Sequence, residues 1–468
     1  MLSILTAAFA ADVTLSPGDD VASLTAALQP GDEVIFSAGT YTLPGSVTWT
    51  GLGTAEQPIT LRGEGEVVLE LTAGGTAVYV TESTFLTLEG LTIRAAATYA
   101  ERFTGLQINA STDVRVSNVE IGPVGGTGLY LSGDNARITV SDVQIHTTAD
   151  GHGVYVGCWD AACWTQDSTF ERLWIHDIGD DGYGFELEPG CQNVTLRDSV
   201  IYRVGGWGVV TGSTEQGAPN LIESNAVWET TQGGMYVGGS ARVRNNVVFN
   251  SASYGVRLTD DGRGTLKDVA FTFNTVADTA SVAVDVSSWA GKTGMVLANN
   301  VIANPIGRAV TFGNAGWDDT VYISGNVVTG FIDGFDALTY VGADTPFLPG
   351  GGWYDFTDVE AWDFYPADGG AMIDAADPSS ATWIPETDFN GAGRDGTAPD
   401  AGAYEFEGAG NPGWGLREGF KDVAAYAPRA AEVQGGCCKD ADESSAEGAA
   451  FFLGLAALGL RRRRASAG

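Results

Sequence analysis

A repeat of roughly 26 residues is the feature of this sequence that most restricts its fold. β-Branched residues recur once in each repeat, and a second apolar residue comes five positions before each of them. Later in each repeat a Gly is followed by an apolar, a variable and an apolar residue, as in residues 153–156. The β-branched positions are Ile121, Ile145, Ile175, Ile201, Val227, Val248, Val276, Ile302 and Val328.

Each repeat therefore contains short segments with an alternation of two, separated by tight turns. No helical pattern of about ten residues lies between them, which excludes a fold built from βαβ units. We predict an all-β fold in which each repeat forms one turn of a right-handed parallel β-helix of about ten or more turns. Equivalent residues would then stack roughly 4.8 Å apart along the axis of the coil.

An asparagine recurs two positions before the β-branched residue in five successive repeats. Stacked amides can hydrogen-bond to one another and to the backbone of the turn, so we expect a structural ladder rather than a functional site. These residues are Asn225, Asn246, Asn274, Asn300 and Asn326.

The N-terminal part of the chain contains features of a cap for such a coil. Residues 21–28 form an amphipathic helical pattern after the turn sequence at residues 17–20, and Gly-rich turns and short strands follow. This arrangement resembles the cap and first turns of pectate-lyase-like β-helix proteins, and with the repeats the resemblance spans residues 12–330. It implies the fold but not the activity, because such coils include lyases, glycosidases, epimerases, adhesins and spacers.

A second resemblance lies between the coil and the C-terminus. We assign residues 11–335 to the β-helix and residues 336–407 to closing turns, where the sequence at 363–366, 371–375, 388–394 and 400–405 resembles the choice-of-anchor Q domain. We expect Arg394 to form a structural ion pair with Asp388 or Asp400. We interpret residues 408–436 as a linker.

The two ends of the chain look like targeting signals. Residues 1–10 end in a small-x-small pattern typical of signal peptides. Residues 437–468 contain Cys437 and Cys438, a short apolar stretch suited to a transmembrane helix, and four consecutive Arg. This order resembles MYXO-CTERM sorting signals, which implies export, a processing protease, and anchoring at the cell surface or outer envelope. An ordinary C-terminal membrane anchor is the alternative.

The formal charge of −35, from 24 basic and 59 acidic residues, excludes several partners. Nucleic acid, anionic lipid surfaces and bare polyuronate chains need clustered Lys and Arg. We therefore expect a neutral or calcium-bridged polysaccharide or surface glycan as partner, and membrane contact only through the C-terminal segment. We expect a monomer that requires no cofactor, with calcium as an optional ion.

The candidate site follows from the three His, which all fall in two neighbouring repeats. His146 and His176 occupy equivalent positions, and His152 precedes a Gly at the start of a strand. Acidic and aromatic residues gather near them and form an outward-facing strip from residue 146 to residue 257, in which carboxylates accept hydrogen bonds from sugar hydroxyls and rings stack on sugars. The remaining candidates are Asp150, Tyr155, Asp180, Asp181, Tyr183, Glu186, Trp207, Tyr236 and Arg257.

Two function classes fit this strip. A glycosidase would use two carboxyl groups, and we assign catalysis to Asp180, Asp181, His176, His152 and Glu186 and ligand binding to the other candidates. If the chain is an enzyme, a glycosidase is favoured over a lyase, because Lys and Arg are scarce. The other class is a non-catalytic adhesin or envelope structural protein. The His spacing does not favour a metal site.

Three cysteines lie beside this strip. Cys158 and Cys163 bracket a Trp-containing loop, and Cys191 occupies the corresponding position one repeat later. Export permits a disulfide. Both the Cys158–Cys163 and the Cys158–Cys191 pairings fit the sequence.

Overall fold

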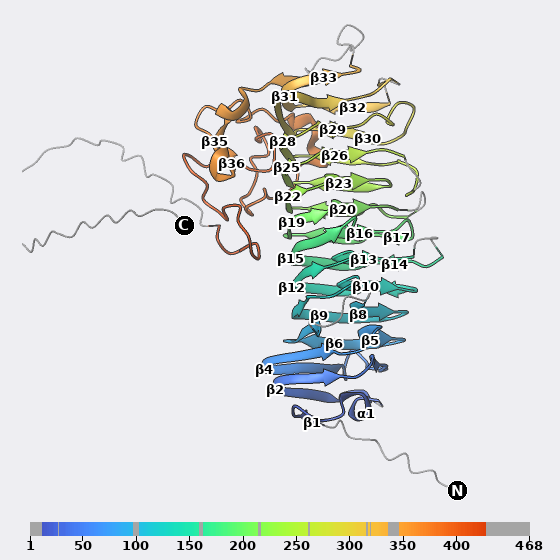
Figure 1. Cartoon of the computed structure of the whole chain (residues 1–468). Helices are drawn as coiled ribbons and strands as arrows, with labels where there is room; N and C mark the ends of the chain where they lie inside the picture. Colours follow the sequence, from blue (N-terminus) through green and yellow to red (C-terminus); the bar gives the residue numbers. More distant parts are fainter. Residues whose placement is uncertain are drawn as a thin grey trace, which may run out of the picture. The chain divides into compact units, whose positions relative to one another are not determined.

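The computed structural model describes residues 12–26, 28–96, 103–158, 162–213, 217–260, 263–314, 317–318, 320–335 and 346–426. In this part of the chain, 34 strands join one continuous sheet that winds into a parallel β-solenoid of about 11 turns (Figure 1). The predicted parallel β-helix is therefore confirmed.

The register between turns is the one that the repeat predicted. Ile145 pairs with Ile175, and Ile175 pairs with Ile201. All three side chains are fully buried. Each such aliphatic side chain contributes about 1.5–3 kcal/mol by leaving water.

The solenoid has three sheets along its length. The first sheet, which faces one side of the coil, consists of β3 (Val47–Trp49), β5 (Thr76–Thr81), β8 (Thr104–Asn109), β10 (Leu129–Ser132), β13 (Val154–Val156), β16 (Phe185–Leu187), β20 (Trp207–Thr211), β23 (Gly233–Val237), β26 (Tyr254–Leu258) and β29 (Val282–Asp285).

The second sheet contains β1 (Asp12–Leu15), β6 (Thr84–Glu89), β18 (Thr195–Arg197), β21 (Asn220–Glu223), β24 (Ala241–Arg244), β27 (Ala270–Thr272), β30 (Met295–Ala298) and β32 (Val321–Ser324). Short strands precede it in three turns: β11 (Asn135–Ala136), β14 (Thr165–Gln166) and β17 (Cys191–Gln192).

The third sheet contains β7 (Thr92–Ala95), β19 (Val200–Gly205), β22 (Ala226–Thr230), β25 (Val247–Ser251), β28 (Thr275–Thr279) and β34 (Phe347–Pro349). Four long strands bend from the second sheet into the third: β2 (Glu33–Leu43), β4 (Ile59–Leu71), β9 (Thr112–Ile121) and β12 (Thr139–Thr148). The strand β15 (Thr169–Asp180) does the same, whereas β31 (Val301–Thr311) and β33 (Asn326–Asp333) run from the third sheet into the first.

The N-terminal helix is shorter than predicted. α1 spans Val21–Leu24, and Asp20 caps it by accepting a hydrogen bond from the Ser23 backbone N–H. The Thr25 hydroxyl donates to the Val21 carbonyl and accepts from the Trp49 indole N–H, at 2.7 and 2.8 Å. The chain therefore leaves the helix after one turn because Thr25 is fixed to the first sheet.

The predicted asparagine ladder is present and buried. The Asn274 amide group donates to the Val243 and Thr272 carbonyls, at 2.9 and 3.1 Å. Its carbonyl oxygen accepts the backbone N–H of Asn246 at 3.0 Å. The same pattern joins Asn300 to Asn326, so each amide satisfies the backbone of its own turn and of a neighbouring one.

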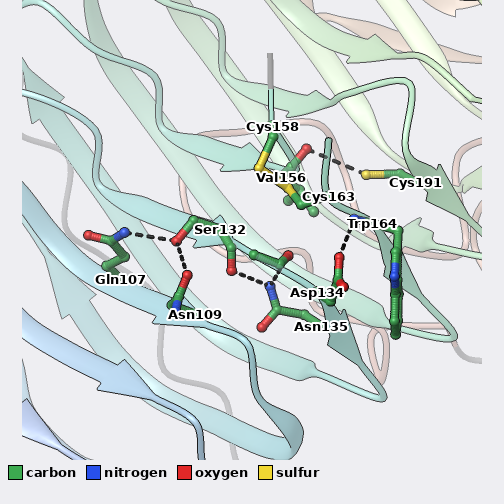
Figure 2. Close-up of a disulfide and its surroundings, with 11 residues drawn as sticks. Gln107, Asn109, Ser132, Asp134, Asn135, Val156, Cys158, Cys163, Trp164 and Cys191 are labelled. Carbon is green, nitrogen blue, oxygen red and sulfur yellow. Dashed lines mark hydrogen bonds between the residues drawn. A yellow bond between two sulfur atoms is a disulfide. The ribbon is translucent and has the colours of Figure 1, made fainter. Parts of the chain in front are cut away.

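A disulfide joins Cys158 to Cys163, which resolves the pairing that the sequence left open (Figure 2). Cys191 stays a buried thiol that donates to the Val156 carbonyl at 3.4 Å. Burial raises the pKa of the Cys191 thiol well above its ordinary value, so it remains protonated.

After the last turn, the chain folds back along the outside of the third sheet. This returning segment, residues 350–426, contains the hairpin β35 (Phe356–Asp358) and β36 (Asp363–Pro366) and the 3₁₀ helices η1 (Gly352–Asp355), η2 (Val359–Ala361) and η3 (Pro378–Trp383). It buries a second apolar cluster against the outward side chains of the third sheet, including Tyr202, Trp228, Phe249, Phe364 and Trp414.

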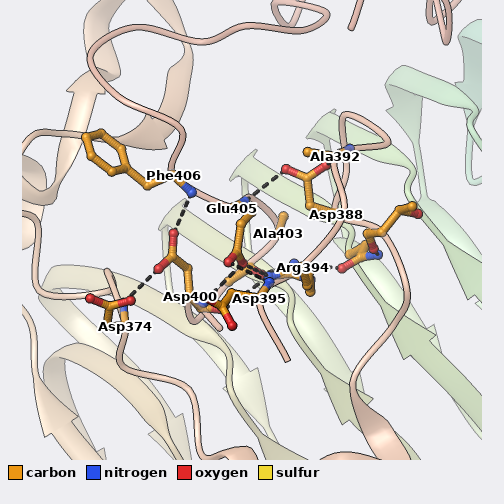
Figure 3. Close-up of polar contacts among 12 residues, drawn as sticks. Asp374, Asp388, Ala392, Arg394, Asp395, Asp400, Ala403, Glu405 and Phe406 are labelled. Carbon is orange, nitrogen blue, oxygen red and sulfur yellow. Dashed lines mark hydrogen bonds and ion pairs between the residues drawn. The ribbon is translucent and has the colours of Figure 1, made fainter. Parts of the chain in front are cut away.

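Arg394 fastens this segment, but not through the partner we expected (Figure 3). Its guanidinium, 1% exposed, forms an ion pair with Glu405 at 3.3 Å and donates to the Asp400 backbone carbonyl. The Asp388 carboxylate instead accepts backbone N–H groups of Asn390, Ala392 and Glu405. The predicted pairing with the Asp388 or Asp400 side chain was wrong, because backbone donors of the tight turns occupy both carboxylates.

Residues 408–426, which we interpreted as linker, are part of this packing. Trp414 is 1% exposed, and the Lys421 ammonium is buried, where it forms an ion pair with Asp198 at 2.8 Å. Residues 1–11 and 427–468, with the predicted signal peptide, the rest of the linker and the sorting signal, lie outside the described residues. Within the described ranges, no helix is long and apolar enough to span a membrane.

Replacing Asn274 by Ala should destabilise the coil strongly. The Val243 and Thr272 carbonyls and the Asn246 N–H would lose their partner at a fully buried position, at about 1–3 kcal/mol for each group. Thermal unfolding followed by circular dichroism should show a clearly lower midpoint than for Gln57→Ala, which removes an exposed side chain. Equal midpoints for the two variants would show that the ladder does not support the fold.

Candidate functional site

The outward face of the first sheet brings together most of the aromatic and acidic candidates. Strand pairing aligns the outward residues of successive strands in one column, and a second column lies just before these strands. The first column is Tyr130, Tyr155, Glu186, Val210, Tyr236 and Arg257. The second is His152, Tyr183, Trp207, Gly233 and Tyr254.

The local sequence explains why these side chains face outward. Phe185 and Leu187 point into the core, so the alternation of β16 turns Glu186 to the outside. Gly184 lies just before this strand. A larger residue would clash there, because a Cβ would lie 2.5 Å from the Gly208 carbonyl oxygen. Glycine thus lets neighbouring turns approach closely beside the candidate site.

Glu186 is the centre of a charged cluster that sequence reasoning found only in part. Its carboxylate forms an ion pair with Arg263, whose Nη1 also lies 3.7 Å from Glu188. Its other oxygen is 3.3 Å from His152 Nδ1. Glu186 and Glu188 are buried, whereas the His152 and Arg263 side chains are 26% and 18% exposed. Glu188 and Arg263 were missed.

Arg263 reaches this cluster from a loop three turns further along the coil. Arg263 comes after β26 in the sequence and lies against Gly212 and Gly238 of the preceding turns, which leave room for it. A Cβ at Gly212 would lie 2.6 Å from the Arg263 carbonyl oxygen, and one at Gly238 would lie 2.9 Å from the Arg263 Cβ. These two glycines are the only signal for this contact that we find in the sequence.

Burial controls protonation in this cluster. Desolvation raises the pKa of Glu186 to about 7, and Glu188 adds to this while Arg263 opposes it. Desolvation, assisted by Arg263, lowers the pKa of His152 to about 4. Because the Tyr183 backbone N–H donates to His152 Nδ1 at 3.0 Å, the neutral imidazole carries its proton on Nε2. At neutral pH His152 is therefore a hydrogen-bond donor.

Aromatic rings surround the cluster. The His152 ring centroid lies 5.2 Å from that of Tyr155 and 5.1 Å from that of Tyr183. Burial raises the pKa of the Tyr155 hydroxyl, the nearby Glu188 adds to this rise, and the hydroxyl stays protonated. Trp207 and Tyr254 stack at 6.0 Å. The partly exposed Tyr155, Tyr183 and Tyr254 offer ring surface beside the charged groups.

Tyr236 and Arg257 have partners within the coil. The Tyr236 hydroxyl donates to the Thr259 carbonyl at 2.9 Å, and only 3% of this residue is exposed. Arg257 lies 3.3 Å from the Asp285 carboxylate, with its guanidinium 5.2 Å from the Tyr254 ring centroid. Arg257 extends the donor-bearing face toward the C-terminus, whereas Tyr236 mainly supports the sheet.

The structure places His146 and His176 on the third sheet, away from the strands of the first. Their rings stack at 5.3 Å with an interplanar angle of 6°. His146 Nε2 lies 3.1 Å from Glu120, and His176 Nδ1 lies 2.7 Å from Asp177. A single strip containing all three His is therefore not formed, because the turn after β12 separates the two sheets.

The turns between the third and first sheets hold three acidic candidates. Asp150, Asp180 and Asp181 are exposed there, unlike the buried Glu186. Asp181 has a φ of 60°, which Asp tolerates in turns. Among the described residues, no group of three His, Cys, Asp or Glu stands in a metal-binding arrangement.

The pKa of Glu186 is raised and that of His152 is lowered. Their effects on the pH dependence of the free energy of unfolding therefore oppose each other. The folded state keeps a proton on Glu186, so this contribution to the free energy of unfolding is lost as pH rises from 4.5 to about 7. The neutral His152 contributes above pH 6.5, and its contribution is lost as pH falls to about 4.

In Glu186→Gln, the unfolding temperature should therefore rise more steeply than in wild type as pH increases from the pKa of His152 to that of Glu186. In His152→Gln, the unfolding temperature should fall over the same pH range. Differential scanning calorimetry across this range, with the exposed Glu56→Gln as control, measures both slopes. Slopes identical to wild type in both variants would contradict the assigned shifts.

Comparisons with known proteins agree with the fold. Residues 69–217 match the family model described as "Right handed beta helix region", and no curated protein matches the chain. The solved structure of pectate lyase Pel9A is 15% identical, with a TM-score of 0.52 over 84% of this chain and 96% of the lyase. The A-module of the Azotobacter vinelandii mannuronan C-5 epimerase AlgE6 is 18% identical, with a TM-score of 0.54 over 68% and 91%. At these identities the likeness concerns the fold alone: the chain is similar to these enzymes as a right-handed parallel β-helix.

Proposed function

We propose that the outward face of the first sheet around His152 and Arg263 binds an acidic polysaccharide. The observation that carries this proposal is a pair of partly exposed donors, Arg263 and the Nε2–H of His152, over the buried Glu186. A guanidinium has five N–H donors, so the pairing of Nη1 leaves donors for a ligand carboxylate. The sequence alone favoured a neutral or calcium-bridged glycan, because Arg263 was not recognised as part of this face.

Two further observations support a polysaccharide. The rings of Tyr155, Tyr183 and Tyr254 lie along the coil axis, in the turns of β13, β16 and β26, and give a sugar chain apolar surface. The fold is shared with a pectate lyase and a mannuronan C-5 epimerase, both named for reactions on polysaccharides.

The cluster also supplies groups for acid–base chemistry. Removing a proton next to a uronate carboxylate requires a cation that neutralises the carboxylate, and Arg263 fits this role. Glu186, with its pKa of about 7, exchanges a proton near neutrality. Hydrolysis needs two carboxyl groups at one glycosidic bond. Asp180 and Asp181 are exposed, whereas Glu186 lies buried beneath Arg263, so this geometry favours uronate chemistry over the glycosidase we expected.

A non-catalytic surface adhesin is the second candidate. It is favoured by the 1% exposure of Glu186, because a buried carboxyl paired with Arg263 is also a common structural ion pair. In both cases we propose an exported, surface-anchored protein on the basis of residues 1–10 and 437–468. Calcium would assist by bridging the acidic ligand to the acidic surface.

The double variant Arg263→Ala/Glu186→Gln tests the proposed site. It removes both partners of the Arg263–Glu186 ion pair together, so neither of these two charges is left without the other. Titration calorimetry with oligogalacturonate and oligomannuronate, with and without calcium, should show affinity weakened about tenfold or more. Arg242→Ala, on the second sheet, should bind like wild type.

Parallel assays for unsaturated uronate, C-5 epimerisation and new reducing ends separate the enzyme from the adhesin. Product that disappears in His152→Gln supports a catalytic role. Binding without product supports an adhesin. If wild type binds neither oligomer, or the double variant binds both unchanged, the proposed site is wrong.

A further inference from the structure

The outward face of the third sheet is divided into a covered and an uncovered part. Along β19, β22 and β25 its side chains are buried under the returning segment. Toward the N-terminal turns, this cover ends near Phe420, which is 39% exposed and packs edge-on against Trp174 at 5.6 Å. The cover stops where the outward residues change from aromatic and aliphatic to polar.

A groove of about 500 Å³ lies at this boundary. Its walls come from β4, β7, β9 and β12, from the turns beside them, and from Phe420 of the returning segment. The volume is within the range of small-ligand sites. The side chains that decide its chemistry are Glu66, Asn118, Glu120, Asp142, Gln144 and Phe420.

Two of the three carboxylates already have side-chain partners. Asp142 holds Arg172 through two hydrogen bonds of 2.7 and 2.8 Å, and Glu120 contacts His146. Both retain acceptor lone pairs for hydroxyl groups, and Asp142 gains less from a second cation because Arg172 already pairs with it. The groove residues include three carboxylates and no Lys or Arg, so the groove favours a neutral ligand over an anionic one.

We propose that this groove binds a neutral oligosaccharide, with Phe420 stacking on a sugar ring and the carboxylates and amides accepting or donating hydroxyl hydrogen bonds. An aromatic wall opposite carboxylate and amide groups suits sugar rings, which have apolar C–H faces and polar edges. This site is on a different sheet from His152 and Arg263, and it does not depend on the function proposed for them.

The site requires both the coil and the returning segment. Phe420 is held between two ion pairs, Arg203 with Glu418 and Lys421 with Asp198. The ligand would therefore contact residues 278 positions apart in the sequence, Asp142 and Phe420. Its binding would also hold the returning segment against the coil.

Saturation-transfer NMR and titration calorimetry of the full chain with cellohexaose, mannohexaose and xylohexaose test this proposal. We expect at least one of them to bind. Phe420→Ala should weaken that binding about tenfold, whereas Phe420→Tyr keeps the ring and should retain it. Phe331→Ala, which removes an exposed ring elsewhere on the coil, is the matched control.

Circular dichroism should show that Phe420→Ala keeps the wild-type unfolding temperature within a few degrees. The Arg263→Ala/Glu186→Gln variant should bind the neutral sugar like wild type, which separates this site from the first-sheet site. Absence of binding by all three sugars, unchanged binding by Phe420→Ala, or binding of spermidine instead of sugars would overturn the proposal.

Discussion

Parallel pairing of each turn with the next is the interaction on which the rest of the molecule depends. It places Ile145, Ile175 and Ile201 in one buried column, and it converts residues far apart in the sequence into neighbours on a face. The backbone must also turn three corners in each repeat without losing hydrogen bonds. The amides of Asn274 and its equivalents satisfy one of these corners from inside the core. Side chains on the outside are thereby left for function.

Two of the scarce cations are themselves buried. Arg394 and Lys421 lie inside the packing between the returning segment and the third sheet, each with an acidic partner. Burial lowers the pKa of both, and the nearby carboxylates oppose this change. Removing one partner of such a pair would leave a buried charge, so these pairs hold the segment in one position. The same charge balance governs Arg263 and Glu186 on the first sheet.

The sequence correctly predicted the contacts between equivalent residues of successive repeats. It placed Tyr155 beside Glu186 and His146 beside His176, because strand pairing preserves the period. It could not place Arg263, whose loop lies outside the repeat and crosses three turns. The prediction that the three His share one strip was based on periodicity. Periodicity aligns residues along the axis of the coil, but it does not show on which sheet each residue lies or in which direction that sheet faces. The partner of Arg394 depended on backbone donors in turns, which side-chain patterns do not reveal.

Net charge and local charge lead to different expectations for the ligand. The charge of −35 repels polyanions over a Debye length of about 8–10 Å at physiological salt. Arg263 and Arg257 act within contact distance, where a directional hydrogen bond outweighs the screened repulsion. In the binding that we propose for the first sheet, screening by salt or calcium would affect the approach of an acidic chain, whereas the guanidinium groups would determine where it binds. The third-sheet groove has no such cations, so an acidic protein with these two faces would select ligands of different charge on each of them.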